Sequence, residues 1–78
     1  MVKAYVLIKS EPGQQGDIYT KVLKLKGVRN ANTIIGPYDL IVFVESIDLA
    51  NLGKMIVSKV QNLKGVKDTV TCVVIEPI

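Results

Sequence analysis

The chain contains no histidine, no tryptophan and a single cysteine, Cys72. Without histidine, a Ser-His or Cys-His nucleophile pair cannot be assembled. One cysteine and no histidine also exclude an internal disulfide and a zinc site of the usual Cys/His kind within one chain. The sequence has no paired-carboxylate motif either, so we expect no enzymatic activity, no metal and no cofactor. Cys72 lies in the middle of an apolar stretch and is predicted to be a small buried residue rather than a reactive thiol.

Aromatic residues are few, with three Tyr and one Phe among 78 residues. A sheet that binds RNA needs exposed aromatic rings, and the predicted central strands offer only Tyr5 and Phe43 among aliphatic residues. The net charge is +3, but the basic residues are scattered. Their densest stretch, 21–26, alternates with Val and Leu as on the solvated face of an amphipathic helix. We therefore expect no direct contact with nucleic acid.

Hydrophobic residues make up 49% of the chain, which is a large share for so short a sequence. A chain of this length forms one domain at most, and small domains bury a smaller fraction of their surface. An oligomer interface is the usual place for the excess apolar surface. The N-terminal apolar run ends at Lys9 and is too short for a signal peptide or a membrane span. We therefore expect an oligomer in the cytoplasm with no membrane contact.

Hydrophobic periodicity predicts four strands and two helices. The strands are 2–9, 28–35, 40–44 and 66–76, and the helices run from about 12 to 26 and from 48 to 64. The first strand is apolar on both faces and is predicted to be central, whereas 28–35 is the most polar strand and suits an edge. Ile18, Val22 and Leu25 share one face of the first helix. Gly27 and Gly65 are predicted to end the helices.

The second helix has a clear predicted start and a clear apolar stripe. Asp48 is a good N-cap, and Ile47 and Leu52 have the spacing of a hydrophobic staple. The stripe is predicted to be buried and consists of Leu49, Leu52, Ile56, Val60 and Leu63.

The chain also contains an internal repeat, since 25–30 (LKGVRN) matches 63–68 (LKGVKD). Each copy marks a helix end, a Gly cap and the start of a strand. Two strand-helix-strand units give an α+β fold of the ferredoxin-like βαββαβ type. Right-handed crossovers place both helices on one face of a four-stranded antiparallel sheet. The other face is left bare and largely apolar, so we predict a dimer formed by two sheet faces.

The sequence Gly36-Pro37-Tyr38-Asp39 lies between the second and third predicted strands. Pro37 suits the second position of a tight turn, so these residues are predicted to form a hairpin tip. A hydroxyl, a carboxylate and backbone left open by Gly36 make the tip a candidate binding site. The structural alternative is a simple turn in which Asp39 bonds to its own backbone.

These features together resemble the effector-binding (RAM) domain of the Lrp/AsnC, or feast/famine, transcription regulators. The βαββαβ order, the Gly-Val after each helix, 36–40 (GPYDL) and 65–71 (GVKDTVT) carry the resemblance, which covers the whole chain, 1–78. It implies a domain that binds an amino acid or related metabolite between dimers and assembles into rings of dimers. Because Met1 directly precedes the first strand, it also implies a stand-alone form without a DNA-binding domain, which influences full-length regulators through mixed oligomers.

The resemblance assigns roles to the residues of the candidate site. Asp39 would pair with the α-ammonium group of an amino acid, and amides near Gly36 to Tyr38 would receive its carboxylate. Tyr38 would line the side-chain pocket or donate its hydroxyl group to the ligand. Thr69 and Thr71, from a neighbouring strand or subunit, would add hydroxyl contacts, although both also suit a strand for structural reasons alone. The competing function is a protein–protein oligomerisation module that binds no ligand.

Overall fold

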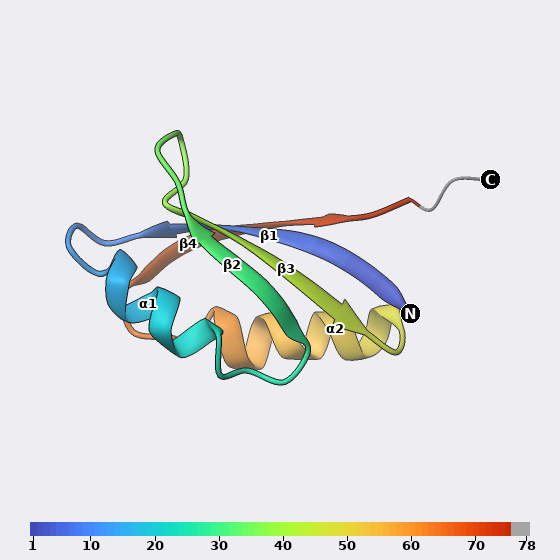
Figure 1. Cartoon of the computed structure of the whole chain (residues 1–78). Coiled ribbons are helices and arrows are strands. Elements are labelled where there is room, and N and C mark those ends of the chain that lie inside the picture. The colour runs from blue at the N-terminus through green and yellow to red at the C-terminus, as the bar shows by residue number, and fades with distance from the viewer. Residues whose placement is uncertain (76–78) are drawn as a thin grey trace.

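The computed structural model describes residues 1–75 and has the predicted α+β architecture. In chain order the elements are β1 (Val2–Ser10), α1 (Gln15–Val22), β2 (Val28–Thr33), β3 (Leu40–Ser46), α2 (Leu49–Met55), a π-helical segment η1 (Ile56–Val60) and β4 (Val66–Val73). The strands form one antiparallel sheet in the order β2-β3-β1-β4, and the helices cover one face of it (Figure 1). The ferredoxin-like prediction is confirmed, with β1 in the interior of the sheet and β2 at an edge.

Both helices are shorter in α-helical geometry than the hydrophobic pattern predicts. α1 ends at Val22 instead of near residue 26, because tight turns follow in which the Leu25 N–H donates to the Val22 carbonyl at 3.1 Å. The second helix changes to π-helical geometry in η1, where the Gln61 N–H donates to the carbonyl of Ile56 at 2.9 Å. Periodicity alone does not distinguish these variants, since all of them keep one face of the segment against the sheet.

The remaining element ends are close to the prediction. Asp48 is the N-cap of α2, and its Oδ1 accepts a hydrogen bond from the Asn51 N–H at 2.8 Å. β2 ends at Thr33, before the predicted end at 35, so the connection to β3 is longer than expected. β4 ends at Val73, and the predicted end of the last strand at Glu76 lies outside the described residues.

The core lies between the sheet and the helices. Alternate residues of β1 and β3 are fully or almost fully buried, as the two-residue period of a strand requires. Ile18 and Val22 of α1 pack against them, as do Leu52, Ile56 and Val60 of the second helix. The predicted apolar stripe of the second helix is therefore largely confirmed, with Leu63 partly buried at its end.

Two residues at the start of the second helix differ from the prediction. Leu49 remains 57% exposed, so it does not belong to the buried stripe. Ile47 is 76% exposed while Leu52 is buried, so the predicted hydrophobic staple between them does not bury Ile47. Its side chain instead lines a cavity at this end of the sheet.

The sheet face opposite the helices is bare and apolar, as predicted. In the register of the sheet, Tyr5 pairs with Phe43 on one side and with Cys72 on the other. The rings of Tyr5 and Phe43 are 5.0 Å apart, and Tyr5 remains 44% exposed. Leu7 lies between Ile41 and Val70 in the same way. These six residues, called the bare face below, form a continuous surface across β3, β1 and β4.

The prediction that Cys72 is buried is wrong for the single chain, because its thiol is exposed. Cys72 lies on the edge strand β4 and points to the face that no helix covers. The apolar sequence around Cys72 predicts burial, but it does not show which part of the molecule would cover the side chain. Burial of this thiol requires a second chain on the bare face.

Gly27 and Gly36 provide a matched test of backbone conformation. Gly27 has a φ of +95°, and a Cβ atom built there lies 2.8 Å from the Glu45 carbonyl oxygen. At Gly36 nothing lies within 4 Å of such a Cβ, and its φ is not positive. We expect Gly27→Ala to lower the free energy of unfolding by on the order of 2 kcal/mol, and Gly36→Ala by less than about 0.5 kcal/mol. Urea unfolding measures both, and equal losses would contradict the geometry.

Candidate functional site

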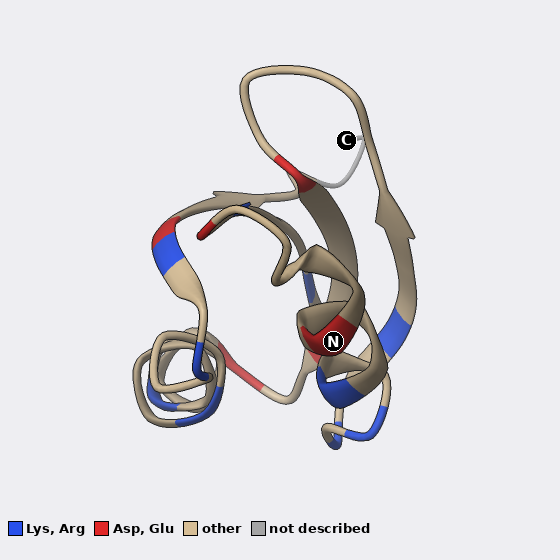
Figure 2. Cartoon of the chain, turned by 90° about the vertical axis from the view of Figure 1, so that its left-hand side faces the viewer, with Lys and Arg blue, Asp and Glu red and all other residues tan. Residues whose placement is uncertain are grey.

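The predicted site lies in a loop of residues 34–39 rather than in a tight turn. The Ile34 N–H donates to the Asp39 carbonyl at 2.9 Å and closes the loop. Figures 1 and 2 show that the loop rises from the sheet on the side opposite the helices. Gly36 and Pro37 are exposed, whereas Tyr38 and Asp39 are partly buried. The loop therefore presents its backbone to solvent beside the bare face.

The end of β1 holds this loop in place. The Asp39 N–H donates to the Ile8 carbonyl at 2.9 Å. The Asp39 Oδ2 atom accepts hydrogen bonds from the Ser10 N–H at 2.8 Å and from the Ser10 hydroxyl at 3.2 Å. The Lys9 ammonium group donates to the Pro37 carbonyl at 3.1 Å. The partners of the Asp39 carboxylate thus belong to a neighbouring strand and not to its own turn.

These contacts favour the ionised form of Asp39. The hydrogen bond from the Ser10 N–H is the main cause that lowers the pKa of the Asp39 carboxyl below its ordinary value of 3.8. Partial desolvation acts in the opposite direction, and the Ser10 hydroxyl and the charge of Lys9 lower the pKa further. The loop therefore presents a fixed negative charge at neutral pH, which is the complement of an ammonium group.

The lowered pKa predicts how stability depends on pH. A carboxyl whose folded-state pKa is lowered stabilises the fold above its unfolded pKa of about 4, and this contribution is lost as the pH falls through the folded-state pKa. Asp39→Asn removes the titration. We expect the difference in unfolding free energy between wild type and Asp39→Asn to be constant from about pH 5.5 to 7 and to shrink below about pH 4. Urea unfolding across this range measures it, and a difference independent of pH would contradict the assignment.

Thr69 and Thr71 do not join the loop within one chain. They pair with Ile8 and Val6, whose side chains face the helices, so both threonines belong to the helix side of the sheet. The Thr69 hydroxyl accepts a hydrogen bond from the Gln61 side chain at 3.1 Å, and Thr71 is exposed. Because the loop rises on the other side, a site that combines loop and threonines requires a second chain.

Sequence reasoning missed the two anchors of the loop, Lys9 and Ser10. Both lie far from the loop in sequence, and nothing in their spacing indicates the contact. The pairing of Ile8 with Leu40 in the sheet places the end of β1 beside the start of β3. A correct prediction of the register between β1 and β3 would therefore have placed Ser10 next to Asp39.

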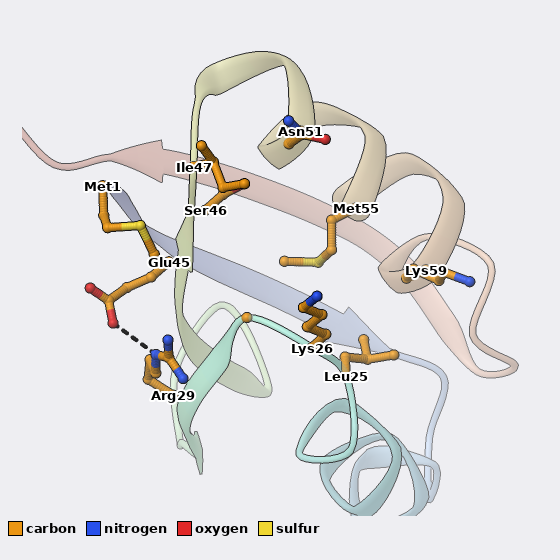
Figure 3. A pocket seen from close by; sticks show the side chains of 11 residues that line it. Met1, Leu25, Lys26, Arg29, Glu45, Ser46, Ile47, Asn51, Met55 and Lys59 are labelled. Atoms are coloured by element: carbon orange, nitrogen blue, oxygen red, sulfur yellow. Dashed lines mark hydrogen bonds and ion pairs between the residues drawn. The ribbon is translucent and has the colours of Figure 1, made fainter.

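A cavity of about 470 Å³ lies at the opposite end of the sheet (Figure 3). β3 begins beside the loop at Leu40 and ends at Ser46, which lines this cavity. The cavity is lined by Met1, Leu25, Lys26, Gly27, Arg29, Glu45, Ser46, Ile47, Asn51, Met55 and Lys59. A smaller polar cavity of about 290 Å³ is lined by Gln61, Val66, Lys67, Asp68 and Thr69. The residues of the 34–39 loop line neither of them.

Within residues 1–75 no group of three His, Cys, Asp or Glu side chains is placed to hold a metal ion. No helix in this part of the chain is long and apolar enough to cross a membrane.

Comparison with known proteins gives one family. A family model described as the Lrp/AsnC ligand binding domain matches residues 3–78. An uncharacterized HTH-type transcriptional regulator of Pyrococcus furiosus is 30% identical over 73 residues, which are 90% of this chain and 49% of the regulator. This chain thus spans about half the length of the curated relatives that it matches.

Solved structures with the same fold include chains of similar size and longer regulators. A hypothetical protein from Pyrococcus horikoshii is 31% identical with a TM-score of 0.91, and the match covers 99% of this chain and 93% of that one. A transcriptional regulator from Neisseria meningitidis, solved as a complex with L-methionine, has a TM-score of 0.89 over 99% of this chain and 51% of its own. Its sequence identity is 16%, so it shows the shared fold alone.

Proposed function

Because the chain belongs to the Lrp/AsnC ligand binding domain family, we propose that residues 1–78 form a domain that senses an amino acid or a related small metabolite. The signal is transmitted through the assembly of the domain and not through catalysis, in keeping with the relatives, which are HTH-type transcriptional regulators. The observation that carries the proposal is the anchored 34–39 loop with its ionised Asp39. The cytoplasm, where such regulators act, is the proposed compartment.

Recognition uses the two charged ends of an amino acid. Both hydrogen bonds from Ser10 end on Oδ2 of Asp39, so Oδ1 is the oxygen that accepts the α-ammonium group. Exposed backbone amides near Gly36 bind the α-carboxylate, since N–H groups in a loop suit oxyanions. Tyr38 lines the space for the side chain. The Lys9 contact to Pro37 keeps these groups in position before the ligand arrives.

Assembly completes the site. Two chains pair through their bare faces, which buries Tyr5, Phe43 and Cys72 in the dimer. Dimers join into a ring, so that a loop from one chain meets Thr69 and Thr71 of a neighbouring chain at the ligand. Mixed assembly with full-length Lrp/AsnC regulators passes the signal on to those regulators, and residues 1–78 make no direct contact with nucleic acid.

The alternative is an oligomerisation module that binds no ligand. One observation favours it: the contacts of Asp39 with Ser10 give the carboxylate a structural role even without a ligand. The bare face has the same role in both accounts. The two therefore differ only in whether the loop binds an amino acid.

Isothermal titration calorimetry with each of the twenty amino acids separates the two. We expect one or a few amino acids to bind in a fixed ratio to the chain. Their N-acetyl derivatives, which lack the α-ammonium charge, are expected not to bind. No binding by any amino acid, with the assembly unchanged, would overturn the proposal and support the oligomerisation module.

A further inference from the structure

The cavity at the end of the sheet remote from the loop, called the distal cavity below, has the size of a small-molecule site. Its volume is about 470 Å³, within the range of roughly 300–1,000 Å³ that such sites occupy. One wall is formed by α2 and η1, and the facing wall by the connection between α1 and β2 (Figure 3). The end of β3 and Met1 close the remaining side. None of these residues belongs to the site proposed for the amino acid.

The lining of the distal cavity is largely apolar. Leu25 and Met55 pack against the core with one side and line the cavity with the other, so their positions are supported from behind. Ile47 and Met1 add further apolar surface, and Ile47 is one of the most exposed hydrophobic residues of the described chain. Burial of this surface by the aliphatic part of a ligand is favourable.

The charges around the distal cavity are mainly positive. Arg29 and Glu45 form an ion pair at 2.8 Å and offset each other. Lys26 and Lys59 come from the two facing walls, and the ammonium group of neither forms an ion pair or hydrogen bond with another residue of the described chain. Figure 3 shows Lys26 between Leu25 and Met55, and Lys59 farther out with its ammonium group directed away from the other lining residues. The cavity therefore presents uncompensated positive charge beside its apolar wall.

The wall that carries Met55 and Lys59 has unusual helical geometry. η1 begins directly after Met55 and includes Lys59. Single π-helical turns are frequent at functional sites, because they redirect side chains relative to a regular helix.

We propose that the distal cavity binds a small aliphatic carboxylate. Its carboxylate group pairs with Lys26, with further attraction from Lys59, and its hydrocarbon chain lies against Leu25, Met55 and Ile47. A zwitterionic amino acid fits poorly, because Glu45, the single carboxylate in the lining, is already paired with Arg29. The distal cavity thus differs in ligand class from the amino-acid site at Asp39, and the inference does not depend on that site.

The two methionines of the chain, Met1 and Met55, both line the distal cavity and provide selective reporters. We would label their methyl groups with ¹³C and record NMR spectra during titration with hexanoate and with 4-methyl-2-oxopentanoate. The expected result is saturable shifts of both methyl signals. Shifts with both anions indicate a general site for aliphatic carboxylates, and shifts with the oxo acid alone indicate a site for 2-oxo acids. Neutral hexanamide is expected to cause much smaller shifts.

Two charge reversals of equal size test the role of Lys26. Lys26→Glu is expected to weaken binding at least about tenfold, because it removes the charged partner of the carboxylate. Lys24→Glu makes the same change in the same connection, at an exposed residue that does not line the cavity, and is expected to have little effect. The proposal is overturned if neither anion shifts the methyl signals, if hexanamide shifts them equally, or if the two variants weaken binding equally. Asp39→Asn is expected to leave this binding unchanged.

Discussion

Asp39→Asn is expected to weaken amino-acid binding by on the order of a hundredfold while the fold and the dimer persist. A hydrogen bond to a charged group contributes about 1.5–3 kcal/mol, and each 1.4 kcal/mol changes the affinity tenfold. The asparagine oxygen can still accept the Ser10 N–H bond, so the loop keeps its main anchor. The substitution therefore removes the charge that meets the α-ammonium group and retains most of the local structure.

Asp17→Asn is the matched control for this substitution. Asp17 is an exposed carboxylate in the first turn of α1, and no role in binding is proposed for it. The control removes the same charge and is expected to leave the affinity unchanged. Calorimetry of both variants measures their affinity for the identified amino acid, and sedimentation shows whether each variant is still a dimer. Full affinity of Asp39→Asn would reject the charge as the basis of recognition, and loss of the dimer would indicate a structural role instead.

Phe43→Glu is expected to convert the proposed dimer into a monomer at micromolar concentration. Phe43 lies on the β3 side of the bare face, and its ring lies 5.0 Å from that of Tyr5. An unpaired charge in a desolvated interface costs about 3–5 kcal/mol, and a two-fold symmetric dimer contains the substitution twice. The dissociation constant should therefore rise roughly a thousandfold or more. Analytical ultracentrifugation measures it directly.

Val57→Glu is the control for this charge, and Cys72 is a second readout. Val57 is 60% exposed on η1, outside the bare face, so Val57→Glu should leave the dimer intact. The thiol of Cys72 is exposed in the single chain and is covered in the proposed dimer. Its reaction with a thiol reagent should be slow in wild type and Val57→Glu, and fast in Phe43→Glu. A wild-type monomer, or a Phe43→Glu variant that remains dimeric, would contradict the sheet-to-sheet interface.

The parts of the fold that the sequence predicts are those set by local rules. Alternation along β1 and β3 gives the two faces of the sheet, and Gly27 and Gly65 end the helical segments with positive φ as expected. These patterns depend on residues near one another in the chain. Such local patterns are sufficient to predict the order of the elements, the uncovered face of the sheet and the family.

The features that the sequence did not predict depend on distant neighbours. The exposure of Cys72 follows from its place on an edge strand of an uncovered face. The bonds between Asp39 and Ser10 follow from the register of β1 against β3. Within one chain the strand order places Thr69 and Thr71 on the other side of the sheet from the loop, so their predicted contacts with a ligand depend on a second chain. Sequence patterns single out such residues but do not show where they lie relative to one another.

Native mass spectrometry of the purified chain, with and without a mixture of the twenty amino acids, tests whether the domain binds an amino acid as it assembles. We expect dimers or rings of dimers in which each proposed site gains the mass of one amino acid. The same spectrum identifies the ligand and its ratio to the chain. An assembly whose mass and stability do not change with any amino acid would contradict the sensing function and shift the search to protein partners.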